Sequence, residues 1–298
     1  MSIVSIVNSR LGLTVGISLV RLLPHWLARR LAYRLAARAA DQTNSALVQA
    51  VRSNQAVVRN LPLDHPSIEA AVHSVLRNTA RNYLSLFKAI RGEYAGLLAT
   101  GDLDEEIISR VEACLAEGKG MLFVGPHTVG WDILLLLMGG LGYPVQVLVD
   151  DETVGSYAIQ NEIRRRFGVD VTPINFGSLR RAMSYLRGGG IVLTGVDRPD
   201  AEGELLRFFG RKARLPIGHA RLALRTSAPI MVGATFYDGN ERYRASCLAF
   251  IETTEYAGRS NPEVELAQRV IRELETFIQR HPAQWLMFYP VWPEGAYR

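Results

Sequence analysis

Residues 121–138 read MLFVGPHTVGWDILLLLM. Residues 121–124 are a short apolar run of the kind that builds a fully buried strand, and residues 133–138 are a second run that indicates a buried helix. The proline and glycines between the two runs are typical of a turn. A buried strand, a turn and an apolar helix in this order predict the first unit of an α/β domain.

The chain downstream of this unit repeats the same alternation. Short apolar runs alternate with helical patterns bounded by glycine and proline, at residues 145–149, 169–174, 191–196 and 230–236. Residues 243–251 follow an Asp-Gly-Asn turn and should add an antiparallel strand. The expected fold class is therefore α/β, with a mostly parallel mixed sheet flanked by helices on both faces.

Helical patterns frame this region. Residues 68–98 and 104–117 are amphipathic, and a later helix should begin at Asn261-Pro262, where an N-cap residue precedes a proline at the first helical position. This helix should end at His281-Pro282, because the residue before a proline disfavours helical backbone. Residues 285–292 are expected to form a last strand.

The composition points to an intracellular-type protein with an affinity for anions. The 298 residues are 48% hydrophobic, enough for a sizeable core, and the two cysteines have no spacing that suggests a metal site or a redox pair. The net charge is +5, and all but three of the basic residues are arginine. Because the guanidinium fork matches phosphate, acidic lipid surfaces or phosphorylated donors are plausible partners.

The basic charge is concentrated in residues 1–60. This segment has eight arginines and a single acid, Asp41, for a net charge of +7. The mostly apolar stretch at 11–23 is interrupted by Arg21 and is shorter than the roughly 20 residues of a bilayer span. We expect an interfacial pair of helices that contacts anionic lipid, separate from a main domain at 61–298. An ordinary packed helix with a solvated basic face would give the same pattern.

The polar segment after the first strand carries the candidate chemistry. His127 should lie at the carboxyl end of that strand, where open α/β sheets bind ligands. Asp132, five residues later, falls in the first turn of the next helix and could hydrogen-bond the imidazole, which would then act as a base. None of the other five histidines has an acid at this offset. The competing interpretation is that His127 caps the helix and Asp132 favours its dipole.

The segment from Pro126 to Asp132 resembles the H-x4-D/E motif of the lysophospholipid acyltransferase superfamily. It is most similar to the branch that holds the late acyltransferases of lipid A synthesis and the mycobacterial phosphatidylinositol mannoside acyltransferase. Further blocks resemble this branch in the same order, and the resemblance covers residues 120–292. These blocks are Arg164-Arg165-Arg166-Phe167-Gly168, Asp197-Arg198, Phe208-Phe209-Gly210, Leu215-Pro216-Ile217-Gly218 and His281-Pro282 followed by Gln284-Trp285.

The resemblance implies a glycerolipid-acyltransferase-like fold and a transfer reaction. His127 and Asp132 would be the catalytic pair, and the donor would be an acyl thioester on coenzyme A or acyl carrier protein. The acceptor would be a hydroxyl of a lipid or glycolipid, at the cytoplasmic face of the cell membrane, with the protein peripheral or monotopic. No metal and no tightly bound cofactor is expected, because a thioester is already activated.

Other basic and acidic residues would bind the substrates. Arg164, Arg165 and Arg166 could clamp a phosphate of donor or acceptor. Asp197 and Arg198, at a second strand end, should face the same cleft, although a structural ion pair is the alternative.

Three other classes of protein remain to be weighed. A lipid-directed hydrolase fits an α/β sheet with His and Asp, but no Gly-x-Ser-x-Gly segment supplies a nucleophile. A metalloenzyme has less support, since neither His-Glu-x-x-His nor a cysteine cluster occurs. A non-enzymatic membrane-binding protein would explain the charge. A nucleic-acid-binding protein is not expected, because the basic charge lies on apolar N-terminal helices rather than among stacking aromatic residues.

Overall fold

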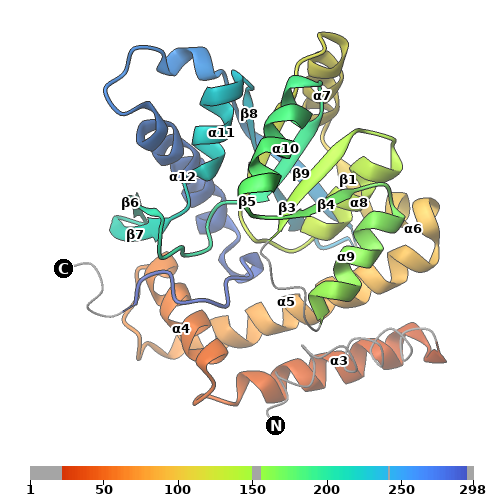
Figure 1. The fold of residues 1–298 in the computed structure, drawn as a ribbon. Coiled ribbons are helices and arrows are strands. Elements are labelled where there is room, and N and C mark those ends of the chain that lie inside the picture. Colours follow the sequence, from red (N-terminus) through yellow and green to blue (C-terminus); the bar gives the residue numbers. More distant parts are fainter. Residues whose placement is uncertain (1–21, 150–155, 241, 294–298) are drawn as a thin grey trace.

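The computed structural model describes residues 22–149, 156–240 and 242–293, and within them a central sheet has the strand order β1-β9-β8-β2-β5-β3-β4 (Figure 1). All neighbouring strands are parallel except β8 and β9, which are antiparallel. The predicted mostly parallel sheet, with an antiparallel addition at 243–251, is confirmed. The strands are β1 Gly101–Leu103, β2 Met121–Gly125, β3 Val145–Val149, β4 Asp170–Pro173, β5 Ile191–Gly195, β8 Ile230–Tyr237 and β9 Tyr243–Ile251.

Helices cover both faces of this sheet, as predicted. Alternate residues of each buried strand point to opposite faces, so Leu122 and Val124 of β2 join one core and Met121 and Phe123 join the other. Helices α10, α11 and α12 cover the first face, while α7 and α8 cover the second. The helices are α3 His25–Ala40, α4 Ala46–Arg59, α5 Pro66–Arg91, α6 Glu93–Thr100, α7 Glu105–Ala116, α8 Trp131–Gly140, α9 Ser156–Arg166, α10 Phe176–Arg187, α11 Gly218–Thr226 and α12 Pro262–Arg280.

The hairpin of β6 (Glu204–Phe208) and β7 (Arg211–Leu215) was not predicted and forms a small separate sheet. The prediction of a strand at 285–292 is wrong. After the 3-10 turn η2 (Pro282–Gln284), this segment forms a single isolated β-bridge within the described residues, between Trp285 and Thr128. A side chain replaces the missing ladder. Asn54 of α4 donates to the carbonyls of Met287 and Tyr289 and accepts from the Val291 N–H.

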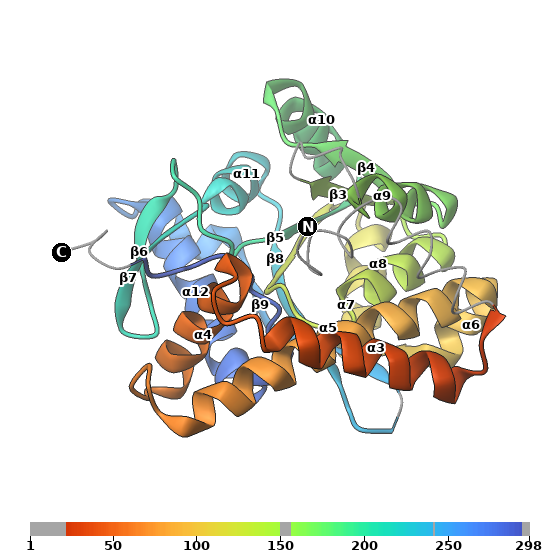
Figure 2. The ribbon, with the colours of Figure 1, turned by 90° about the horizontal axis from the view of Figure 1, so that it is seen from below.

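The N-terminal helices lie together on one side of the molecule, and Figure 2 shows α3 running along α5. The outer face of α3 exposes apolar and basic side chains, among them Trp26, which is 61% exposed, Leu31, Arg30 and Arg34. None of the helices in the described ranges is long and apolar enough to span a bilayer. Residues 1–21 of the predicted membrane-contacting segment, 1–60, lie outside the described residues. Membrane contact and the domain boundary at residue 60 therefore stay predictions.

Candidate active site

His127 lies on the loop between β2, the middle strand of the sheet, and α8. The segment after η2 holds the backbone of this loop: the Leu286 N–H donates to the His127 carbonyl at 2.7 Å, and the Val129 N–H donates to the Gln284 carbonyl at 3.1 Å. The imidazole lies over Gly195 at the end of β5, where a Cβ would come within 2.4 Å of the His127 Cε1 atom. Glycine at this position leaves the room that the ring occupies.

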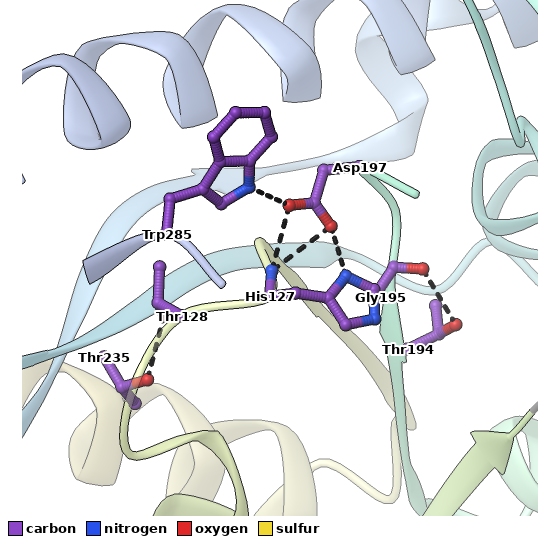
Figure 3. A network of polar contacts seen from close by, with 7 residues as sticks. All are labelled: His127, Thr128, Thr194, Gly195, Asp197, Thr235 and Trp285. Atoms are coloured by element: carbon purple, nitrogen blue, oxygen red, sulfur yellow. Dashed lines mark hydrogen bonds and ion pairs between the residues drawn. The ribbon is translucent and has the colours of Figure 1, made fainter. Parts of the chain in front are cut away.

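Asp197, just beyond β5, is the carboxylate that pairs with His127 (Figure 3). The Nδ1–H of His127 donates to Oδ1 at 2.5 Å, and the backbone N–H of the same residue donates to Oδ2 at 2.9 Å. Oδ2 also accepts from the indole Nε1–H of Trp285 at 2.6 Å. The side chain of Asp197 is fully buried, whereas that of His127 is 43% exposed. The carboxylate thus fixes one edge of a ring that remains open to solvent.

The charges around His127 change the pKa of both partners. Burial lowers the pKa of the imidazole, but the charge and hydrogen bond of Asp197 raise it by more, against smaller lowering effects of the Arg198 and Arg164 cations. Burial raises the pKa of the Asp197 carboxyl, and His127 together with the Trp285 N–H outweighs it, so that this pKa is lowered. Asp197 therefore stays ionised and stabilises the protonated imidazole.

Asp132 does not contact the imidazole in the described structure, contrary to the expectation from the sequence spacing. Its position in the first turn of α8 directs the carboxylate toward α9, where its Oδ1 accepts from Arg164 Nε at 2.9 Å and from Arg164 Nη2 at 2.6 Å. This pair is largely buried, and Arg164 also donates to Asn161 at 2.9 Å. The carboxylate partner of His127 is Asp197 instead, and a catalytic role for Asp132 remains a prediction.

The predicted substrate-binding arginines divide into two groups. Arg164 and Arg198 lie near enough to His127 for their charges to affect its pKa, and the Arg198 guanidinium lies 4.0 Å from the centre of the Tyr289 ring. Arg165 and Arg166 are exposed on α9, and Arg166 forms an ion pair with Glu93 at 3.2 Å. The structure thus gathers His127, Asp197, Arg164 and Arg198, and leaves the other two arginines at the surface. Their roles toward a substrate stay predictions.

Several residues that support the His127 loop were not predicted. Asn82 of α5 accepts from the Gly130 N–H at 2.7 Å, and Thr235 of β8 donates to the Val129 carbonyl at 2.6 Å. Gly130 has φ +83°, and a Cβ there would come within 2.7 Å of the Tyr243 ring. Asn82 and Thr235 have no motif that marks them in the sequence, whereas Trp285 falls within the quoted Gln284-Trp285 block.

Comparison with known proteins adds relatives to this geometry. The family model for bacterial lipid A biosynthesis acyltransferase matches residues 7–294. The chain is 24% identical over 192 residues to the phosphatidylinositol mannoside acyltransferase of Mycobacterium tuberculosis, a match that covers 62% of this chain and 58% of that protein. It is 25% identical over 289 residues to the protein of the same name in Mycolicibacterium smegmatis, covering 95% and 90% of the two chains. The match thus spans little more than half of the M. tuberculosis relative and most of the M. smegmatis one.

Proposed function

This chain belongs to the bacterial lipid A biosynthesis acyltransferase family, and on that basis we propose that it transfers a fatty acyl chain from a thioester donor to a hydroxyl of a lipid or glycolipid. The observation that carries the proposal is the pairing of a half-exposed imidazole with a buried carboxylate, His127 with Asp197. Such a pair, at the carboxyl end of the middle strand, has the geometry of a general base held by an orienting acid.

In the proposed reaction, Nε2 of His127 accepts the proton of the acceptor hydroxyl while the hydroxyl oxygen attacks the thioester carbonyl. Since Nδ1–H is bonded to Asp197, the lone pair of a neutral imidazole lies on Nε2. The tetrahedral intermediate then collapses, the C–S bond breaks, and the leaving thiolate takes the proton from Nε2. The products are an ester and a free thiol, and His127 returns to its neutral form.

Arg164 and Arg198 supply positive charge near His127. Their cations lower the pKa of His127, which keeps part of the imidazole neutral at a given pH despite Asp197. A cation in this place would also stabilise the developing oxyanion or a phosphate of the donor. Asp132 would act through Arg164 by holding its guanidinium in a fixed position. Arg165 and Arg166, which are exposed, would contact the outer part of a phosphorylated substrate.

No tightly bound cofactor is needed for this chemistry, because the thioester supplies the activated acyl group. The donor would be acyl-CoA or acyl carrier protein loaded with an acyl chain. For the acceptor, the names of the two mycobacterial relatives suggest a phosphatidylinositol mannoside as the first glycolipid to test. The catalytic domain would work at the cytoplasmic face of the membrane, with the exposed arginines and Trp26 of α3 against anionic headgroups.

The proposed function is tested by identification of the product. The purified chain is incubated with palmitoyl-CoA and vesicles that contain phosphatidylinositol mannoside, and lipids are analysed by mass spectrometry. Acyl transfer predicts an acceptor heavier by one acyl group, with one free thiol for each ester formed. Thiol release with only free fatty acid would favour a lipid-directed hydrolase. The assay is repeated with acyl carrier protein loaded with an acyl chain as donor and with a lipid A precursor as acceptor. Vesicle binding without turnover in all of these assays would favour a non-enzymatic membrane protein.

A further inference from the structure

Trp285 contacts the His127–Asp197 pair in two ways. Its backbone lies antiparallel to the His127 loop and bridges Thr128, while the neighbouring residues Gln284 and Leu286 exchange hydrogen bonds with that loop. Its indole N–H donates to Oδ2 of Asp197 at 2.6 Å, and its side chain is almost completely buried. Trp285 is therefore tied to the His127 loop by its backbone and to Asp197, the partner of His127, by its side chain.

The Trp285 indole belongs to a cluster of four aromatic residues, and the other three hold it in place. Phe208 packs edge-on against Trp285, with ring centroids 5.9 Å apart, and the Trp292 centroid lies 6.3 Å from that of Trp285. Phe209 completes the cluster by contacts with Phe208 and Trp292. The indole ring is thus surrounded on more than one side, and the direction of its N–H is fixed by packing.

The turn that carries Phe209 has an unfavourable backbone conformation that places the Phe209 ring in this cluster. Phe209 and Gly210 are the two loop residues of the β6–β7 hairpin, and both have positive φ, +52° and +70°. Asn or Asp is the usual residue before Gly in such a turn, and positive φ is unfavourable for a phenylalanine. The backbone N–H of Phe209 donates to Glu275 of α12, which anchors the turn. A bulky ring at this position keeps the aromatic cluster complete.

Trp292 shows what a purely structural tryptophan in the same cluster looks like. It is 7% exposed, and its indole Nε1–H has no hydrogen-bond partner among the described residues. Trp285 differs because its N–H meets a buried anion. In the described structure, the Asp197 carboxylate accepts from Nδ1 of His127, from the His127 backbone N–H, which lies 2.9 Å from Oδ2 and 3.2 Å from Oδ1, and from the Trp285 N–H. Without the indole N–H, Oδ2 would keep only the bond from the His127 backbone N–H, and the two donors of His127 alone would hold the carboxylate in its orientation.

We propose that Trp285 is a positioning residue, whose indole N–H fixes the carboxylate of Asp197 in the orientation that bonds the His127 imidazole. The expected change in kcat rests on the proposed function, whereas the expected change in the hydrogen bonding of the His127 ring does not. Hydrogen bonds to a buried charge are among the stronger ones in proteins, and loss of this one should reduce kcat by about 10- to 100-fold. The KM for the donor should stay within about twofold, because the Trp285 side chain is almost completely buried and presents no surface to a substrate.

The test compares Trp285→Phe with the matched control Trp292→Phe in the full chain. Both variants lose an indole N–H from the same cluster, but among the residues that the structure describes only the Trp285 N–H has a hydrogen-bond partner. Histidine labelled with ¹⁵N reports the ring by NMR, and the His127→Ala spectrum assigns the His127 signals. We expect Trp285→Phe to shift or broaden the Nδ1 proton resonance and to lower kcat, while Trp292→Phe, which keeps an aromatic ring in the cluster and the Trp285 N–H in place, changes both less. In an Asp197→Asn background, Trp285→Phe should cause no further loss of kcat.

An unchanged His127 spectrum together with unchanged kcat in Trp285→Phe would overturn the proposal, as would equal losses in the two phenylalanine variants. Benzothienylalanine at position 285, which carries sulfur in place of the N–H and keeps the shape of indole, asks the same question if the smaller ring prevents folding. A wild type without acyl transfer would refute the proposed function, whereas the NMR comparison would still decide the role of Trp285.

Discussion

The most informative single substitution is Asp197→Asn, because its consequence follows from the hydrogen bonds that the carboxylate accepts. Oδ2 accepts from two fixed N–H donors, the backbone of His127 and the indole of Trp285. An asparagine must place its carbonyl oxygen there, since its NH2 group would oppose both donors. The NH2 group then faces Nδ1 of His127 in place of Oδ1 and donates to it.

This exchange would reverse the tautomer of the imidazole. With a donor at Nδ1, that nitrogen must carry the lone pair, and the proton of neutral His127 moves to Nε2, which can no longer accept a proton from the acceptor. The loss of the carboxylate charge adds to the effect, because Asp197 raises the pKa of the imidazole and so stabilises its protonated form. A wrong tautomer in a comparable His–Asp pair costs about 10⁴-fold in kcat. We expect a loss of about 10³- to 10⁴-fold here, with folding retained because asparagine has the same shape.

Single-turnover transfer from labelled palmitoyl-CoA measures the rate, and thermal unfolding checks that the variant is folded. The NMR spectrum of ¹⁵N-labelled histidine reports the tautomer directly and should show the His127 proton on Nε2. A folded Asp197→Asn variant that transfers at the wild-type rate would refute the assignment of Asp197 as the orienting acid.

Three further substitutions test other parts of the structure. Asp132→Asn breaks the largely buried pair with Arg164 and should reduce the free energy of unfolding by about 1–3 kcal/mol, between the values for exposed and buried pairs. It should lower kcat by less than Asp197→Asn does, and a fully stable but inactive variant would instead make Asp132 the partner that the sequence spacing predicted. His219 is buried and its pKa is lowered to about 4, so the unfolded state binds the extra proton below about pH 6.5. Wild type should therefore lose up to about 3 kcal/mol of stability as the pH falls from 6.5 to 4. His219→Leu should lose correspondingly less stability in acid denaturation, and parallel curves for the two proteins would contradict this. Replacing Trp26, Arg30 and Arg34 of α3 by serine should weaken binding to anionic vesicles in a flotation assay, by about 1 kcal/mol for each arginine. The same charge loss at Arg207 and Lys212 of the β6–β7 hairpin is the control, and equal binding by the two variants would reject α3 as the membrane contact.

The sheet could be predicted from the sequence because its strands are nearly continuous apolar runs. Runs such as 121–124 and 230–236 are buried on both faces, and a helix pattern separates each run from the next. The strand β1 has only three residues and pairs with β9 far along the chain, so no local pattern marks it. Residues 285–292 have the apolar composition of a strand, but the Asn54 side chain, rather than a neighbouring strand, bonds the backbone of Met287, Tyr289 and Val291.

The active site could be predicted in part. The sequence indicates His127 because it lies just after a buried strand, and Asp197 because it follows another. The pairing of these two residues depends on β2 and β5 being neighbours in the sheet, a fact about strand order that spacing along the chain does not contain. The sequence spacing favours Asp132 as the partner of His127, although a residue in the first turn of α8 can also face α9. Arg164, buried and paired, and Arg165, exposed, differ only by their place on that helix.

The central claim, that His127 is the base of an acyl transfer, is tested most directly by the single-turnover rate of His127→Ala. Wild type and variant are given the same labelled palmitoyl-CoA and the same acceptor vesicles, at enzyme concentrations above that of the donor. A general base contributes typically about 10²- to 10⁴-fold, so ester formation by the variant should slow by at least about 10²-fold while the unfolding temperature changes little. Ester formation by a folded His127→Ala variant at the wild-type rate would contradict the account.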